Sequence, residues 1–337
     1  MIATRCSKAS PGARRFLRAA RGRVAADEGA GRLVTATILQ RERAAIGRVR
    51  VVRLVRLARQ WAVGEVPCAP VRVTFLGTGT SHGVPMIGCD CAVCSSSDPR
   101  DNRLRSSIYV EGDDGLCLLV DTTTDLRTQA LRANVRRIDA VLYTHAHADH
   151  VMGLDELRRF NWMTKRPLPV YGAEHTLDDL RRTFSYVFAP DAPRGGGVPD
   201  LRLTPIAGAC CFGSTTVVPV PVRHGWWDVF GYRFGTFAYL TDCNAIPDAS
   251  IEALAGVDVL VLDALRHTPH PTHFSLAEAG AMARRIGARQ TYFTHIAPEL
   301  GHAETSAGLP GGMTLAYDGL VLELPGPGGD LSADPVE

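Results

Sequence analysis

Three histidines and an aspartate fall within six residues, in the segment Thr144-His145-Ala146-His147-Ala148-Asp149-His150. Only 11 of the 337 residues are histidine, so this concentration is far above the average of the chain. The segment follows residues 138–143, an apolar run typical of a buried strand. Imidazole nitrogens and carboxylate oxygens are ligands that Zn, Mn and Fe accept. On a turn, alternate residues can face two neighbouring metal positions, so we expect this turn to bind divalent metal.

Further polar residues stand at the ends of other predicted strands. Val220-Pro221-Val222 leads to His224, Tyr239-Leu240 leads to Asp242, and Tyr292-Phe293 leads to His295. The run Leu118-Leu119-Val120 likewise ends at Asp121.

Together, these motifs resemble the signature of the metallo-β-lactamase fold superfamily, over about residues 71–324. The resemblance implies an α+β fold, an α/β sandwich with four layers in the order αββα. It implies two active-site divalent ions, Zn or Mn, with one held by His145, His147 and His224, the other by Asp149, His150 and His295, and Asp242 bridging both. Asp121 resembles the family acid that orients a ligand histidine; an ordinary aspartate capping a turn is the alternative.

Three more stretches narrow the resemblance. They are the glycine-rich start at 77–85 with Cys89, Cys91 and Cys94 after it, the segment 103–107, and His273. These are similar to the phosphoribosyl cyclic phosphodiesterase family. The similarity implies a dinuclear hydrolase that cleaves a small cyclic phosphodiester by attack of a metal-bridging hydroxide. The catalytic residues would be Asp149, Asp242 and His273, with His273 as general acid or phosphate contact.

The cysteine cluster predicts a structural zinc in addition to the active-site ions. Thiolates at C-x-C-x-x-C spacing suit zinc. The family's fourth ligand, a histidine three residues after the final active-site histidine, is replaced by Pro298. His302 is the substitute we expect, with Cys68 as the weaker choice. Reduced thiols in a surface loop are the alternative.

Charge is unevenly distributed and bears on the choice of partner. Residues 1–70 contain 15 of the 37 Lys and Arg residues but only 4 of the 35 Asp and Glu residues. Their net charge is therefore +11, and the rest of the chain has −9. Because phosphate contacts require clustered Lys and Arg, we expect no nucleic acid on the core domain and a small-molecule phosphodiester as its substrate. The sequence is also compatible with a homodimer.

Other functions on the same scaffold remain alternatives. They are a thioesterase, an RNA-processing nuclease, and a carrier or oxygenase of the pyrroloquinoline quinone biosynthesis type. The thioesterases lack the cysteine cluster, and the nucleases need a basic arm. The third group departs from the full set of seven ligands.

The chain divides into three expected segments. Residues 1–70 form a basic extension expected to be poorly ordered; a targeting or membrane-surface segment and a nucleic-acid arm are the alternatives. Residues 71–325 form the hydrolase domain, and 326–337 a flexible tail. No run approaches the ~20 apolar residues of a membrane span. The odd number of cysteines and their clustering favour a reducing, cytoplasmic location.

Within the domain we expect three helices among many strands. The helices cover 125–134, 155–162 and 275–286, the last starting at a capping box formed by Ser275 and Glu278. The strands are predicted at 71–77, 106–112, 116–122, 138–143, 169–172, 201–205, 215–222, 230–240, 257–262, 290–293 and 319–324.

Overall fold

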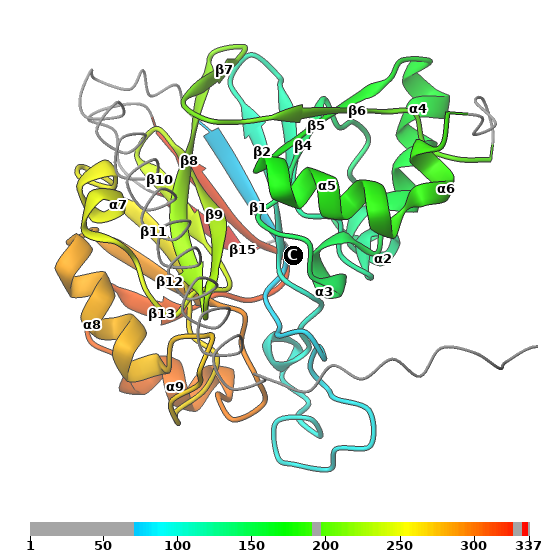
Figure 1. The fold of residues 1–337 in the computed structure, drawn as a ribbon. Helices are drawn as coiled ribbons and strands as arrows, with labels where there is room; N and C mark the ends of the chain where they lie inside the picture. The colour runs from blue at the N-terminus through cyan, green and yellow to red at the C-terminus, as the bar shows by residue number, and fades with distance from the viewer. Residues whose placement is uncertain (1–70, 191–196, 326–331, 336–337) are drawn as a thin grey trace, which may run out of the picture. The chain divides into compact units, whose positions relative to one another are not determined.

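The computed structural model describes residues 71–190, 197–325 and 332–335. In this part of the chain two β-sheets lie face to face, and helices cover the outer side of each (Figure 1). The α+β sandwich expected from the sequence, with layers in the order αββα, is thereby confirmed. The expectation for residues 1–70 lies outside the described residues.

The first sheet has eight strands in the order β15-β14-β1-β2-β3-β4-β5-β6. They are β1 (Val71–Gly77), β2 (Ser107–Gly112), β3 (Cys117–Val120), β4 (Ala140–Leu142), β5 (Leu168–Gly172), β6 (Leu201–Pro205), β14 (Leu320–Leu324) and β15 (Ser332–Pro335). From β3 to β6 the strands are parallel. Strand β15 lies inside the tail expected to be flexible and pairs antiparallel with β14.

The second sheet has seven strands in the order β13-β12-β11-β10-β9-β8-β7. They are β7 (Cys210–Phe212), β8 (Thr215–His224), β9 (Trp227–Phe234), β10 (Phe237–Leu240), β11 (Val259–Asp263), β12 (Gln290–Thr294) and β13 (Met313–Leu315). From β10 to β13 the strands are parallel. The single strand predicted at 230–240 is wrong: the chain reverses at Gly235 and Thr236, and Phe237 pairs with Phe234. Gly235 has φ 57°, a conformation that glycine adopts without steric cost.

Helices flank both sheets. On the side of the first sheet are α2 (Leu126–Arg132), α3 (Ala148–Val151), η2 (Leu154–Leu157), α4 (Arg158–Thr164), α5 (Glu174–Thr183) and α6 (Ser185–Phe188), and on the side of the second are α7 (Asp248–Ala253), α8 (Leu276–Ile286) and α9 (His302–Gly308). A short 3-10 turn, η1, covers Pro99–Asp101. Helix α8 begins at the predicted capping box, in which Ser275 N donates to Glu278 Oε2 at 2.8 Å.

Side-chain alternation along the strands produces three apolar layers. In β11, Val259 and Val261 point into the core between the sheets, whereas Leu260 and Leu262 pack under α8. In β3, Leu118 enters the central core and Leu119 the layer beneath the first set of helices. Because both faces of these strands are covered, they are apolar throughout. Within the described residues, no helix has both the length and the apolar character needed to cross a membrane.

Candidate metal centre

Polar residues at the ends of buried strands meet at one place in the fold. Asp121 follows β3, His145 comes shortly after β4, and His224 is the last residue of β8. Asp242 comes shortly after β10 and His295 directly follows β12. Because parallel strands present their carboxyl ends on one side, the sequence order apolar strand then polar residue delivers these groups to a common edge. The same edge receives α3, which carries Asp149 and His150.

The side chains form two donor groups that share one carboxylate. His145, His147, His224 and Asp242 make up the first, and Asp149, His150, His295 and Asp242 the second; within each group the ligand atoms lie within 4.8 Å of one another. Asp242 Oδ1 lies 3.2 Å from both His150 Nε2 and His295 Nδ1, and its Oδ2 lies 3.8 Å from His145 Nε2. The structure thus brings together all seven residues that the sequence predicted as metal ligands.

Several of the converging nitrogens have no hydrogen-bond partner. His145 Nε2, His150 Nε2 and His295 Nδ1 are buried and make no hydrogen bond of normal geometry, although oxygens of Asp242 lie 3.2–3.8 Å away. A buried polar atom without a partner costs free energy, so such atoms require an explanation. Imidazole nitrogens and carboxylate oxygens in this arrangement fit two divalent cations, one in each group.

Four of the five ligand histidines are electrostatically prepared to offer lone pairs. His150 is the exception: burial would lower its pKa, but Asp242, Asp149 and Asp121 outweigh burial and raise that pKa well above its usual range. Burial lowers the pKa of His295 to about 4, and burial likewise lowers the pKa values of His145, His147 and His224. These rings are therefore neutral at physiological pH, as metal binding requires. Burial would raise the pKa of Asp242, but His150 and His295 outweigh it and hold that pKa well below its usual range.

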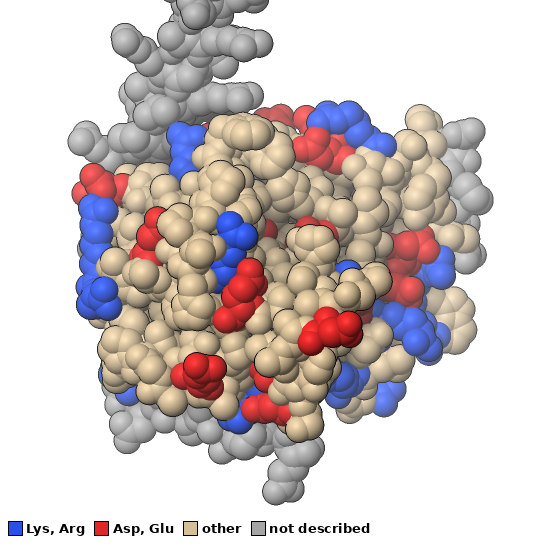
Figure 2. All heavy atoms as spheres, turned by 90° about the horizontal axis from the view of Figure 1, so that it is seen from below, with Lys and Arg blue, Asp and Glu red and all other residues tan. Residues whose placement is uncertain are grey.

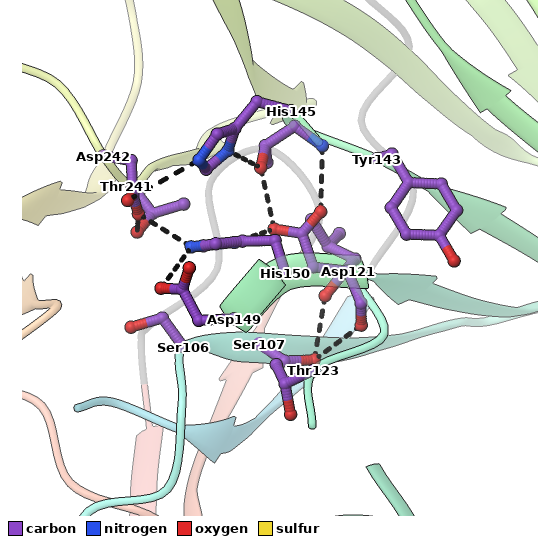
Figure 3. Close-up of polar contacts among 12 residues, drawn as sticks. Ser106, Ser107, Asp121, Thr123, Tyr143, His145, Asp149, His150, Thr241 and Asp242 are labelled. Carbon is purple, nitrogen blue, oxygen red and sulfur yellow. Dashed lines mark hydrogen bonds and ion pairs between the residues drawn. The ribbon is translucent and has the colours of Figure 1, made fainter. Parts of the chain in front are cut away.

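Asp121 fixes the orientation of His150. Its Oδ2 lies 2.7 Å from His150 Nδ1 (Figure 3). The same oxygen accepts from Thr144 Oγ1 at 2.8 Å, and Oδ1 accepts from the Thr144 N–H at 2.9 Å. A carboxylate at Nδ1 keeps a proton there, so Nε2, which faces Asp149 and Asp242, is the nitrogen that would bind a metal after losing its own proton. Asp121 therefore lies where the family resemblance placed it.

Three of these residues have left-handed backbone conformations. The φ angles are 64° at Asp121, 51° at Asp242 and 61° at His295. Side chains other than glycine rarely adopt such values, and each costs of order 1–3 kcal/mol. The turns after β10 and β12 thus place Asp242 and His295 in the centre, and the turn after β3 places Asp121 against His150, each at the expense of local stability.

His273 and Asp263 form a hydrogen-bonded pair beside the donor groups. His273 Nδ1 lies 2.9 Å from Asp263 Oδ2, and its ring stacks on His295 at 4.7 Å. Although burial would lower the pKa of His273, Asp263 outweighs it and raises that pKa to about 9. Asp263 was missed by the sequence reasoning; its position at the end of the apolar strand β11 was the available signal.

The cysteine cluster is a separate, more exposed group. The sulfur atoms of Cys89, Cys91 and Cys94 lie within 4.8 Å of one another. The N–H of Cys94 donates to Cys91 Sγ at 3.4 Å, which lowers the pKa of Cys91, whereas burial raises the pKa of Cys94 to about 11. Three thiols at this distance fit a zinc ion.

His302, the predicted fourth ligand, does not belong to this group. Its Nδ1 lies 3.2 Å from Arg103 Nη2. Because a guanidinium only donates, Nδ1 must accept, and the ring proton resides on Nε2. Neither nitrogen then has a lone pair free for zinc, which corrects the expectation for His302. Cys68, the other candidate, lies outside the described residues.

The four-layer sandwich and its paired donor groups are those of the metallo-β-lactamase fold. The fold implies divalent metal ions, and the residues that would hold them are present. The sequence model of the family described as "Beta-lactamase superfamily domain" matches residues 117–296, more than half of the chain. The chain therefore belongs to this superfamily.

Comparison with curated proteins gives relatives with different names. A protein named octanoyltransferase, from Porphyromonas gingivalis, is 37% identical over 254 residues, which cover 74% of this chain. The chain spans only 51% of that relative's length. A coenzyme PQQ synthesis protein B from Methylobacterium radiotolerans is 28% identical, covering 57% of this chain and 72% of that protein.

Comparison with solved structures adds a measure of similarity in the fold. A protein described as a new diphosphatase from the PhnP family is 48% identical, with a TM-score of 0.71 and coverage of 76% of this chain and 98% of that chain. Zn²⁺-bound PqqB from Methylobacterium extorquens has a TM-score of 0.62 at 24% identity, covering 75% and 100%, and is similar in fold alone.

Proposed function

We propose that this chain hydrolyses a small phosphodiester, with a cyclic ribose phosphate as the first substrate to test. The observation that carries the proposal is the Asp263–His273 pair beside the donor groups. Hydrolysis of a phosphate ester expels an alkoxide, which is a poor leaving group unless it receives a proton in the transition state. His273, whose pKa is about 9, is an acid placed to supply that proton.

The protein side chains divide the chemistry between them. Two bound divalent ions, Zn or Mn, would supply a nucleophile at neutral pH and stabilise charge on the phosphoryl oxygens. Asp263 holds the proton at His273 Nδ1 and so directs Nε2–H towards the substrate. Asp149 and Asp242 contribute carboxylates to the centre, and Asp121 orients His150.

The overall reaction consumes one water. The oxygen of that water forms a new bond to phosphorus and loses a proton to solvent, and the bond from phosphorus to the ester oxygen breaks. The departing oxygen takes the proton of His273 Nε2, and the ring later regains a proton from solvent. The products are an alcohol and a phosphate monoester, which for a cyclic substrate are parts of one molecule.

A second candidate is hydrolysis of a phosphoric anhydride. The 48% identical solved protein carries the description diphosphatase, which favours this reaction class. The same attack on phosphorus would expel a phosphate instead of an alkoxide. Because a phosphate is already a stable anion, this reaction would depend less on His273 than ester hydrolysis does.

Other activities have weaker support. The name octanoyltransferase belongs to a relative of which this chain spans about half. The name therefore does not show whether acyl transfer takes place in the half that matches this chain. Charges on the face shown in Figure 2 are mixed, with acidic and basic side chains scattered over a mostly uncharged surface. That mixture supports a small substrate over a nucleic acid, which requires a continuous basic surface.

A substrate panel tests the proposal. The metal-loaded protein is offered bis(p-nitrophenyl) phosphate, ribose 1,2-cyclic phosphate, a 2′,3′-cyclic nucleotide, a nucleoside diphosphate, a thioester and a tRNA precursor, while bound metal is measured by elemental analysis. Turnover of the phosphodiesters, lost in His147→Ala and Asp149→Ala, supports the proposal. Turnover of the thioester or the tRNA alone, or a normal phosphodiester rate in either variant, contradicts it. Preference for the nucleoside diphosphate selects the second candidate.

A further inference from the structure

Two neighbouring tryptophans stand exposed at the turn between β8 and β9. Trp226 is 78% exposed and Trp227 is 45% exposed. Their rings lie 5.3 Å apart between centroids at 65°, so that together they form an open aromatic corner. Large exposed aromatic side chains that adjoin one another mark a binding surface more often than chance.

This corner adjoins the metal centre. The Trp227 ring lies 4.7 Å from the ring of His147 and 6.1 Å from that of His224, both in the first donor group. A phosphate bound at the donor groups would therefore have its substituents within reach of the tryptophans. The exposed faces of Trp226 and Trp227 lie beside the place where the reaction would occur. An ordinary surface tryptophan has no such position.

The turn that carries the corner is fixed on several sides. Gly225, with φ 62°, donates its N–H to Asn244 Oδ1 at 2.9 Å. A Cβ at Gly225 would lie 2.9 Å from Thr272 Cγ2, so the turn packs closely on the loop that carries His273. Across the hairpin, Arg223 pairs with Asp228 at 2.7 Å. A rigid turn presents its aromatic rings without a large loss of conformational entropy on binding.

From these observations we propose that Trp226 and Trp227 bind a planar aromatic group of the substrate, a nucleobase, by stacking. The inference rests on the proposed function, since it names which phosphate compounds the same site prefers. Stacking of a base on an aromatic side chain is typically worth 1–3 kcal/mol. Trp226 and Trp227 are thus specificity-determining residues that act on the substituent of the phosphate and not on the bond that breaks.

Trp162 offers a matched comparison on the same protein. It is 60% exposed on α4, but Arg159 and Lys165 each place a cation 4.5 Å from its ring. Its ring is therefore already engaged by the protein's own side chains, whereas the Trp226–Trp227 corner borders the reactive centre. Trp162→Ala removes an exposed tryptophan without altering the corner.

The test compares two phosphodiesters that differ only in the base, the methyl ester of AMP and the methyl ester of ribose 5-phosphate. For the metal-loaded protein, Trp226→Ala is expected to raise KM for the AMP ester about tenfold and to change KM for the ribose ester less than twofold. Trp227→Phe should retain most of the preference, and Trp162→Ala all of it. Equal effects of Trp226→Ala on both esters would overturn the proposal while leaving the hydrolase function intact.

A binding measurement separates this inference from the proposed function. AMP should quench the tryptophan fluorescence of the metal-loaded protein, ribose 5-phosphate should not, and Trp226→Ala should remove most of the quenching. If neither ester is hydrolysed but this pattern holds, the hydrolase proposal fails and base binding stands. Absence of quenching by AMP, or quenching by phosphatidylcholine vesicles in its place, would overturn base binding.

Discussion

Within the described residues, the His/Asp centre and the cysteine cluster are built in opposite ways. In the His/Asp centre the donors come from the ends of strands in both sheets, and most are buried. In the cysteine cluster all three donors come from one loop, and Cys91 is exposed. The first is shaped by strands of both sheets, whereas the second has little besides its own loop to hold it. We therefore expect the first to determine activity and the second to affect local stability.

The sharpest test of this contrast removes the carboxylate common to both donor groups. Asp242→Ala should lower turnover about 10³-fold or more, because bound metal contributes several kcal/mol to transition-state stabilisation. Elemental analysis should show loss of active-site metal. Asp248→Ala, which removes an exposed surface carboxylate, is the control and should remain within twofold. Full activity of Asp242→Ala would refute the assignment of the centre.

Removal of the acid beside the centre should have the next largest effect. His273→Asn is expected to lower the hydrolysis of an alkyl phosphodiester about 10²–10⁴-fold and that of bis(p-nitrophenyl) phosphate much less, since nitrophenolate needs no proton to leave. A uniform loss on both substrates would contradict the role of His273 as a proton donor.

The dependence of activity on pH is a second test of the pair formed by His273 and Asp263. His273 is active when protonated, so activity should fall as pH rises through its pKa of about 9. Bound cations act in the opposite direction to Asp263 and would move this limb to lower pH. Asp263→Asn removes the carboxylate that raises the pKa, so the alkaline limb should shift further down. If the alkaline limb of Asp263→Asn lies at the same pH as that of the wild type, the limb does not report the ionisation of His273.

A smaller effect is expected where orientation alone is lost. Asp121→Asn keeps the shape of the side chain but removes the charge that faces His150 Nδ1. Metal affinity should fall about 10–100-fold, as for other residues that orient a ligand histidine. Titration of the chelated protein with metal measures the change, and excess metal should restore most of the activity. Loss that metal cannot restore would indicate damage to the fold instead.

The smallest effect on activity belongs to the cysteine loop. Cys91→Ser should leave turnover within about threefold while removing one bound zinc and lowering Tm by about 2–4 °C, which corresponds to about 1 kcal/mol. Cys211→Ser, an exposed cysteine outside the cluster, is the matched control. Equal zinc content in the wild type and Cys91→Ser would show that the loop binds no zinc.

The fold class and the seven donors could be predicted because short local motifs carry the resemblance to a known superfamily. An apolar strand followed at once by a histidine or aspartate is visible in a short window, as at 138–150 and 290–295. The start of α8 was likewise predictable, since Ser275 and Glu278 form the capping box among themselves.

What could not be predicted depends on contacts between distant segments. Asp263 stands at the end of the apolar strand β11, but only its hydrogen bond to His273, on a loop that follows, indicates its role. His302 could not be excluded as a zinc ligand from the sequence, because its partner Arg103 lies almost 200 residues earlier in the chain. The helix α5 was missed because only Thr176, Leu177 and Leu180 of its ten residues are buried, which leaves a weak apolar pattern.

One carboxylate serving two positions also has a consequence for how the protein acquires its ions. A cation in either group would hold the side chain of Asp242 in place for the other group, whereas repulsion between the two cations would oppose loading of the second. The metal uptake curve should therefore report which effect is larger: a sigmoidal curve would indicate the shared carboxylate, and two separate steps would indicate the repulsion.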